Sequence, residues 1–294
     1  MSRLHILYNP AAGNNTGESA ALRLEELFKE EQKVKRDITK ISDFGEFAKE
    51  LEPDDRIVIC GGDGTLSRFA NDVYDLKIEN EILYFASGSG NDFLRDVEGA
   101  SADLPFRVNE YISCLPTVTV NGKTTRFING VGFGVDGYCC EKGDEERLKS
   151  DKPVDYTAIA VKGLLFDFKP ADAIITVDGN SYAFKRVWIA PTMFGRYYGG
   201  GMLPAPDQRR DNPEKKVSLA LFHGSGKLRT LMVFPSIFKG EHIKHTKMCK
   251  VFEGKEITVT FSHPTPLQID GETVKNVTSY TVKSPSLMRE EITV

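Results

Sequence analysis

The stretch from Ile57 to Thr65, IVICGGDGT, constrains the fold of this chain more than any other. Four apolar, mostly β-branched residues predict a buried strand, which runs directly into a turn with three glycines, one carboxylate and one hydroxyl. The glycines allow a ligand to approach the backbone, and Thr65 can begin a helix whose free N–H groups would face an anion. We interpret this turn as a phosphate-binding element. A strand-to-helix turn without a ligand is the plainer alternative.

Strands and helices alternate through the first part of the chain. Strands are predicted at 4–8, 34–40, 57–60 and 82–86, and helices at about 17–31, from Asp43 onward and after Thr65. Asn15 or Thr16 is the expected cap of the first helix, and Asp43 with Glu46 resembles the start of the second. This alternation predicts a parallel, doubly wound sheet. Its loops 9–17, 61–65 and 87–92 are expected to converge on one edge.

The pattern changes to antiparallel β structure after about residue 108. Hairpins are predicted at 117–128 and 173–189, each around an Asn-Gly or Asp-Gly turn. We therefore predict an α/β domain over 1–108 and a mainly antiparallel, β-sandwich-like domain over 109–284. The tail 285–294 is a candidate to complete the first domain. Further strands are expected at Val217–Phe222, Glu256–Phe261, Leu267–Ile269 and Ser279–Lys283, and helices at 155–168 and 227–238.

Composition excludes some function classes. The formal net charge is −4 and the pI is near 5.8, so no general basic field would attract nucleic acid. The five cysteines form no C-x-x-C pair, which fits a reducing cytoplasm. No apolar run approaches the roughly 20 residues of a membrane-spanning helix. The N-terminal apolar run is too short for a signal peptide. These features predict a cytoplasmic protein without a transmembrane segment.

Six motifs in a fixed order carry a family resemblance. The P-loop pattern Gly-x-x-x-x-Gly-Lys-Ser/Thr is absent from the sequence, so a P-loop is not supported. The segment Gly88–Phe93 lacks the third glycine of a dinucleotide fingerprint, so an ordinary Rossmann site is not supported either. The motifs are Asn9–Gly13, Gly61–Thr65, Ser87–Arg95, Asn129–Asp136, Tyr198–Met202 with Pro206-Asp207, and Ile269–Glu272. Together they resemble the diacylglycerol kinase catalytic domain family, which includes sphingosine and ceramide kinases and bacterial soluble lipid kinases.

The resemblance implies ATP with Mg²⁺ between two domains. A triphosphate with Mg²⁺ needs backbone donors, hydroxyls and a metal-facing carboxylate. Many relatives carry Lys or Arg just after the glycine of the first loop, whereas this chain has Asn14, Asn15 and Thr16 there. Phosphate charge must then be offset by Mg²⁺, by Arg95 or by a basic residue of the second domain. The matching nucleotide-binding positions are Asn9, Gly61, Gly62, Asp63, Gly64, Thr65, Ser87, Gly88, Ser89, Gly90, Asn91, Asp92 and Arg95, with Asp63 also catalytic and Asp92 also a metal ligand.

In the second domain, the resemblance implies that Asp270 accepts the proton of the lipid hydroxyl and that Glu272 faces the metal or nucleotide. A hairpin turn is the plainer interpretation of this Asp-Gly-Glu segment. Asp211 falls where relatives hold a structural cation. In relatives glycine usually follows this aspartate, whereas in this chain Asn212-Pro213 follows it. Asp136 is a candidate for positioning the lipid acceptor or the phosphate. The alternative is that it is a loop carboxylate without a role.

These features predict an ATP-dependent lipid kinase that phosphorylates a diacylglycerol-like or sphingoid hydroxyl at a membrane surface. An NAD kinase is the alternative enzyme, and a nucleotide-binding regulator without catalysis is the alternative of another class. Lys162–Lys169 and Lys227–Pro235 combine apolar residues with flanking basic ones, as interfacial segments do, although core helices also have this pattern. Whether the chain forms a homo-oligomer is left open by the sequence.

Overall fold

The computed structural model describes residues 2–149 and 154–285, and the chain divides into two compact units. Unit 1 extends to Cys114 and unit 2 begins at Leu115. Unit 1 ends later than residue 108 because Asn109 is joined to its sheet: the side chain accepts a hydrogen bond from Ile82 N and donates one to Asn80 O, both at 2.9 Å. The prediction that the tail 285–294 completes the first domain falls almost entirely outside the described residues. Among those described, no helix is both long and apolar enough to cross a bilayer.

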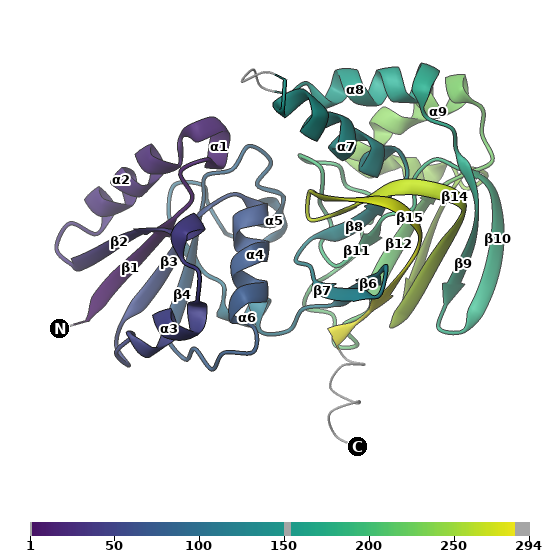
Figure 1. Ribbon diagram of the computed structural model, residues 1–294. Helices are drawn as coiled ribbons and strands as arrows, with labels where there is room; N and C mark the ends of the chain where they lie inside the picture. Colours follow the sequence, from purple (N-terminus) through teal and green to yellow (C-terminus); the bar gives the residue numbers. More distant parts are fainter. Residues whose placement is uncertain (1, 150–153, 286–294) are drawn as a thin grey trace. The chain divides into compact units, whose positions relative to one another are not determined.

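Unit 1 is built on a five-stranded sheet in the order β2-β1-β3-β4-β5 (Figure 1). The first four strands are parallel, as predicted, but β5 runs antiparallel to β4, so the sheet is mixed. The chain leaves β1 toward one edge and β3 toward the other, which makes the carboxyl ends of β1 and β3 a topological switch point. The strands are β1 Arg3–Tyr8, β2 Gln32–Asp37, β3 Arg56–Gly61, β4 Glu81–Ala86 and β5 Phe106–Arg107.

Helices cover both faces of this sheet. On one face Ala21 and Leu24 of α2 pack against Leu4, Ile6 and Val58. On the other face the rings of Phe44 and Phe69, from α3 and α4, meet edge to face at 5.6 Å. The predicted second strand is shorter than expected, because η1 replaces its last three residues. The helices are α1 Ala12–Asn15, α2 Gly17–Leu27, η1 Ile38–Lys40, α3 Phe44–Lys49, α4 Asp63–Val73, α5 Asp92–Asp96 and α6 Asn109–Ile112.

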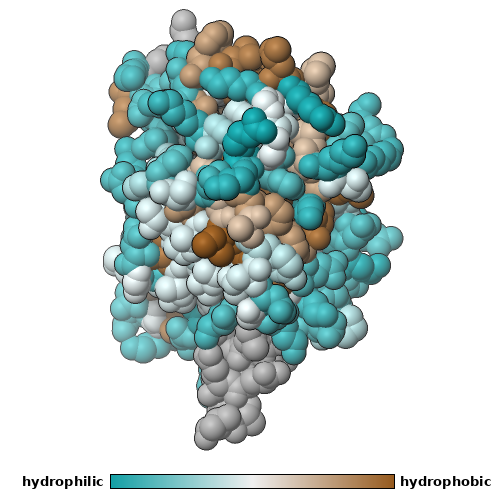
Figure 2. Space-filling view, turned by 90° about the vertical axis from the view of Figure 1, so that its right-hand side faces the viewer, coloured by the Kyte–Doolittle hydropathy of each residue, from teal (hydrophilic) through white to brown (hydrophobic). Residues whose placement is uncertain are grey.

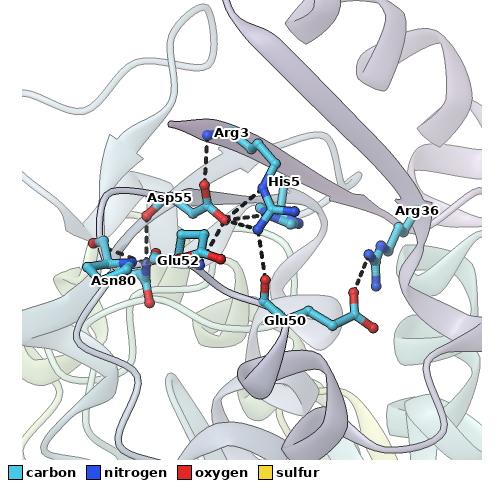
Figure 3. Close-up of polar contacts among 8 residues, drawn as sticks. Arg3, His5, Arg36, Glu50, Glu52, Asp55 and Asn80 are labelled. Atoms are coloured by element: carbon cyan, nitrogen blue, oxygen red, sulfur yellow. Dashed lines mark hydrogen bonds and ion pairs between the residues drawn. The ribbon is translucent and has the colours of Figure 1, made fainter. Parts of the chain in front are cut away.

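A buried polar cluster closes the amino-terminal edge of this sheet (Figure 3). The Asp55 carboxylate accepts hydrogen bonds from Arg3 N at 2.7 Å and from the Arg3 guanidinium, and lies 3.1 Å from His5 Nε2. Burial lowers the pKa of His5 despite the Asp55 partner. Burial alone would raise the pKa of Asp55, but the hydrogen bonds outweigh it and hold that pKa well below its usual range. The cluster therefore contains a neutral histidine and an ionised aspartate.

This cluster predicts a loss of stability in mild acid. A lowered histidine pKa means that stability is lost as pH falls below about 6.5, and the Asp55 contribution is lost only below about 3.8. We expect the urea midpoint to fall more steeply between pH 7 and pH 5 for the wild type than for His5→Gln. Asp136 titrates in the opposite sense, because its raised pKa makes stability fall as pH rises through about 6, and the comparison with the variant removes its effect. Equal slopes would contradict the neutral assignment of His5.

Unit 2 is built on a ten-stranded, antiparallel sheet with the order β13-β12-β11-β8-β14-β15-β6-β7, to which β9 and β10 attach beside β14. The predicted strands Glu256–Phe261 and Leu267–Ile269 are one strand, β14, whose register shifts between Thr260 and Leu267. Its first half pairs with β9 and its last residues pair with β8. The strands are β6 Thr117–Val120, β7 Lys123–Arg126, β8 Gly130–Phe133, β9 Ala171–Val177, β10 Asn180–Val187, β11 Thr192–Met193, β12 Val217–Phe222, β13 Cys249–Gly254, β14 Glu256–Ile269 and β15 Glu272–Lys283.

Helices gather at one end of unit 2 (Figure 1). Their inward side chains, among them Leu164, Phe168 and Val233, form one buried cluster with Trp188 and Phe222 of the β structure. The predicted helices over 155–168 and 227–238 each change type midway, from α to π and from α to 3₁₀. Helix α7 was not predicted, because its polar and glycine content hides any apolar periodicity. The helices are α7 Val135–Arg147, α8 Tyr156–Lys162, η2 Gly163–Asp167, α9 Lys227–Val233, η3 Phe234–Lys239 and η4 Glu241–Lys244.

Candidate active site

The turn between β3 and α4 leaves backbone donors free at the start of a helix. The Tyr84 hydroxyl fixes the strand end by donating to Gly61 O at 3.1 Å. Thr65 N and Leu66 N both bond to Gly62 O. Within the described residues, no acceptor is found for the N–H groups of Asp63 and Gly64, and a methyl group at Gly64 would meet no atom within 4 Å. This helix start offers two donors and open space to an anion.

The Asp63 carboxylate joins two of the predicted loops. Its two oxygens accept hydrogen bonds from Asp92 N at 2.8 Å and Phe93 N at 2.9 Å, which are the first N–H groups of α5. Ser87 N donates to Gly61 O, so the loops also share a backbone bond. A Cβ on Gly88 would lie 2.5 Å from the Cα of Gly62, and only glycines allow this approach. Asp63 therefore caps the start of α5 and holds the loop 87–92 against the β3–α4 turn.

The first loop reaches the same place from β1. The Asn9 amide donates to Thr65 Oγ1 at 2.9 Å, and its carbonyl accepts from Ala11 N. A Cβ on Gly17 would lie 1.8 Å from Asn9 O, so glycine is required where α2 begins. The Thr16 side chain does not cap α2 as predicted, because its hydroxyl donates to Gly13 O instead. The predicted convergence of the three loops at the carboxyl edge of the sheet is thus confirmed within unit 1.

The remaining predicted nucleotide positions differ in their exposure. Asp92 is buried at the start of α5, whereas Ser89 and Arg95 are exposed, and Arg95 Nε donates to Gly90 O at 3.2 Å. A further segment, residues 38–43 after β2, also lies at this edge and was not predicted. Two open hollows of about 410 and 480 Å³ share its residues 40–43. This segment lies at the carboxyl edge because β2, which precedes it, pairs in parallel with β1. The alternation of strands and helices in the sequence could have predicted this position.

In unit 2, Asp270 is held by the backbone of the segment before β8. Its carboxylate accepts hydrogen bonds from Ile128 N at 2.6 Å, Asn129 N at 2.8 Å and Gly130 N at 3.0 Å. The residue has φ +47, in the turn between β14 and β15. Asp270 and Asn129 come from two of the sequence motifs, and these bonds place them side by side. These three bonds engage both carboxylate oxygens of Asp270.

Glu272, two residues further on, has a different environment. It is exposed at the first position of β15, and no hydrogen bond of its side chain is found within the described part of the chain. The next residue, Thr273, donates to Asp144 of α7 at 2.7 Å, which fixes the strand start beside that helix. Glu272 therefore keeps both carboxylate oxygens available on a well-anchored strand.

Sequence reasoning missed Arg210. Its guanidinium donates to Asn129 Oδ1 at 2.6 Å and to Ile128 O, although the residue is buried. Asn129 O in turn accepts from Phe194 N and Gly195 N. Arg210 therefore fixes the segment to which Asp270 is bound. In the sequence it stands in a run of charged residues typical of a solvated loop, so no sequence signal distinguished it.

Asp136 is a buried helix residue and not a loop carboxylate. Oδ2 accepts a hydrogen bond from the Tyr198 hydroxyl at 3.0 Å, and Oδ1 accepts from Gly137 N. Burial raises the pKa of Asp136 to about 6, against the lowering effect of these bonds. The contact links the Asn129–Asp136 motif to the Tyr198–Met202 motif. Its role toward an acceptor stays a prediction.

Asp211 lies in an exposed segment and is paired. Both carboxylate oxygens accept hydrogen bonds from Arg209, at 2.9 Å each, and this partner lowers the pKa of Asp211. Within residues 2–149 and 154–285, no three His, Cys, Asp or Glu side chains gather so as to hold a metal ion. A cation at Asp211 would have to displace Arg209. The prediction of that cation site stays a prediction.

These features define a class of protein: a mixed α/β unit with anion-facing loops, followed by an antiparallel β unit with an anchored acidic turn. The diacylglycerol kinase catalytic domain family model matches residues 3–114, and the YegS C-terminal NAD kinase beta sandwich-like domain model matches residues 129–289. The chain therefore belongs to the family that joins these two domains, as the sequence motifs predicted.

Similar proteins extend over nearly the whole chain. A putative lipid kinase YtlR of Bacillus subtilis is 25% identical over 98% of this chain and 99% of its own length. A diacylglycerol kinase of Staphylococcus epidermidis is 25% identical over 92% of this chain and 85% of its own. Among solved structures, a putative diacylglycerol kinase from Bacillus anthracis aligns with a TM-score of 0.64 and 19% identity over 96% of this chain and 91% of its own, and this likeness concerns the fold.

Proposed function

We propose that this protein is an ATP-dependent lipid kinase that transfers the γ-phosphate to a hydroxyl of a diacylglycerol-like or sphingoid lipid. Family membership supports a kinase, and the relatives' names support a lipid acceptor. The observation that carries the proposal is the helix start at Asp63 and Gly64, whose N–H groups have no acceptor among residues 2–149 and 154–285, at the switch point where three loops meet. Such a site suits a nucleotide phosphate.

The residues of unit 1 fit Mg²⁺ together with a nucleotide. Mg²⁺ is commonly held by one or two carboxylates and by the substrate's phosphates, so a cluster of three protein ligands is not needed. Asp92, buried next to the phosphate-facing turn, is the carboxylate we assign to it, with Thr65 and Ser89 as hydroxyl donors to the phosphates. The ion would neutralise phosphate charge, which the first loop, lacking Lys and Arg, does not.

We propose Glu272 as the proton acceptor and Asp270 as the residue that positions it. Phosphoryl transfer needs one group that accepts the proton of the attacking hydroxyl. Both carboxylate oxygens of Asp270 accept hydrogen bonds from backbone N–H groups, whereas the Glu272 side chain is exposed and unengaged within the described residues. This reverses the roles that the sequence resemblance implied for the two carboxylates.

Gly64→Ala tests the phosphate-binding turn. The added methyl would meet no neighbouring atom within 4 Å in the described part of the chain, so the fold should tolerate it, but it would stand among the N–H groups that face the phosphate. We expect an unchanged melting temperature and an ATP dissociation constant at least about tenfold higher, since one lost phosphate contact of this kind is worth roughly 1.5–3 kcal/mol. Isothermal titration calorimetry measures it. Gly226→Ala, equally free of steric contact in unit 2, is the matched control, and equal ATP affinity in both variants would contradict the site.

A side-by-side acceptor assay tests the activity. Purified protein is incubated with radiolabelled ATP and Mg²⁺, and is offered diacylglycerol, sphingosine or NAD. We expect label in a lipid. Label in NADP would instead favour an NAD kinase, the alternative that the description of the C-terminal domain keeps open. Normal ATP binding without transfer to any acceptor would favour a regulator.

With a lipid acceptor, we propose that the protein acts from the cytoplasm and contacts the membrane surface peripherally. Pulling a diacyl lipid wholly into water would expose its apolar chains at a large cost in free energy. The described residues contain no helix that could cross the membrane. Extraction of total lipid after overexpression, with a search for one accumulated phospholipid, would identify the acceptor. Sedimentation analysis would show whether a homo-oligomer forms.

A further inference from the structure

The helices at one end of unit 2 expose an unusual set of large apolar side chains. Phe166 of η2, Leu228 and Met232 of α9 are 72%, 72% and 75% exposed. Figure 2 shows hydrophobic residues gathered at its upper end, where Figure 1 draws α8 and α9. Lys227 Nζ donates to Leu165 O at 2.9 Å, which holds α9 beside η2. We call the exposed side chains of Phe166, Leu228 and Met232 the apolar rim.

The apolar rim is separate from the hydrophobic core of these helices. Their inward side chains, Leu164, Phe168, Val233 and Ile237, are all buried in the core cluster of unit 2. A helix that only covers a core presents a polar outer face, whereas α9 also exposes two large apolar side chains, Leu228 and Met232. Phe168 lies in the same predicted interfacial segment as Phe166, Lys162–Lys169, but its side chain is buried in the core and cannot contact a partner. Exposed large apolar residues on neighbouring elements mark an interaction surface.

Charge around the apolar rim points to an anionic partner. Residues 156–169 and 227–239 contain five basic residues and one acidic residue, although the whole chain carries a net charge of −4. The basic residues are Lys162, Lys169, Lys227, Arg229 and Lys239, and all are exposed. Apolar side chains surrounded by Lys and Arg are typical of segments that insert into the headgroup region of a bilayer with anionic lipids.

We propose that the apolar rim and its basic flanks are the surface by which this protein docks on an anionic lipid bilayer. Phe166, Leu228 and Met232 enter the headgroup and acyl boundary, while the basic side chains contact the lipid phosphates. Each basic group near such a surface contributes about fivefold in affinity, so five of them together with three apolar anchors suffice for reversible binding. The inference rests on the proposed lipid kinase function for its biological purpose. The docking itself requires neither nucleotide nor catalysis.

Vesicle co-sedimentation without ATP tests the docking surface. The probe is a suspension of phosphatidylglycerol and phosphatidylcholine vesicles at 30:70 molar ratio. We expect the full chain to sediment with them, less so at high salt, and the triple variant Phe166→Ser, Leu228→Ser, Met232→Ser to bind at least about tenfold more weakly, because three apolar anchors are lost. The matched control replaces Leu22, Leu104 and Ile174, three exposed apolar residues elsewhere, with serine and should bind as the wild type does.

The activity arm separates this inference from the proposed function. On a short-chain diacylglycerol dispersed in water, the triple variant should keep the wild-type rate, and on vesicle-embedded substrate it should lose at least about tenfold. Vesicle binding without any lipid phosphorylation would leave the docking surface standing and refute the kinase. Equal vesicle binding by the triple variant and the wild type would overturn the docking surface. So would a wild-type dimer that the triple variant abolishes, because a second copy would then be the occupant.

Discussion

The variant Glu272→Gln is expected to lower kcat for lipid phosphorylation by about a thousandfold, the usual contribution of a general base, while ATP affinity and stability stay unchanged. Glutamine preserves the size of the side chain and removes only its ability to take the proton. Glu272 is exposed and its side chain makes no hydrogen bond within the described residues, so the fold loses nothing. Steady-state kinetics, calorimetry with ATP and urea unfolding measure the three quantities.

The matched variant Asp270→Asn should behave differently. One carboxylate oxygen becomes an NH₂ group that faces backbone donors, so we expect a stability loss of about 2–3 kcal/mol together with reduced activity. If Asp270→Asn abolishes turnover in a stable protein while Glu272→Gln remains active, the roles are as the sequence resemblance implied and not as we propose. The pair therefore decides between the two carboxylates.

Asp63→Ala is the second large effect. Removal of this carboxylate leaves Asp92 N and Phe93 N without their acceptor and uncouples the loop 87–92 from the β3–α4 turn. We expect a loss of about 2–3 kcal/mol in unfolding free energy, the sum of two charge-assisted bonds at a helix start, and at least about a tenfold rise in the ATP dissociation constant. Thermal unfolding and calorimetry with Mg²⁺ and ATP give both values.

Asp63→Asn separates the charge from the cap. The amide oxygen can still accept one of the two N–H bonds, so stability should recover by about half, whereas a direct role of the charge toward Mg²⁺ would keep nucleotide binding impaired. Normal affinity for Mg²⁺ and ATP in Asp63→Ala would contradict the assignment of this turn to the nucleotide.

Much of unit 1 could be predicted because its signals are local. Apolar runs of strand length predicted β1, β3 and β4, and glycine-rich turns mark the ends of β3 and β4. Asp43 was correctly predicted at a helix start: its side chain accepts hydrogen bonds from Gly45 N and Glu46 N. The antiparallel strand β5 is only two residues long, and such a strand carries no periodicity. Helix α7 was missed for the related reason that a mostly polar helix carries too little apolar periodicity.

The candidate site could be predicted less completely, since side-chain partners are long-range. Asp270 and Glu272 are equivalent in sequence, each a carboxylate in a hairpin turn, yet one meets three backbone N–H groups from residues 128–130 and the other meets solvent. Arg210 was likewise not separable from surface residues, and the motif that contains Tyr198 did not show which residue its hydroxyl contacts. Their hydrogen bonds to Asn129 and Asp136 span many residues, and no short pattern records them.

The turn Gly61–Thr65 was predicted from the sequence alone, because three glycines directly after a buried strand allow the tight turn and the close backbone approach that a strand-to-helix connection needs. The order of this turn with the other motifs placed the chain in its family. The tertiary structure decided which groups at that turn are free to bind. The Asp63 carboxylate accepts hydrogen bonds from α5 and the Asn9 amide donates to Thr65, whereas the N–H groups of Asp63 and Gly64 find no acceptor in the described part of the chain. Local propensity sets where a strand ends and a helix begins, but only packing of distant segments determines which polar atoms already have a partner.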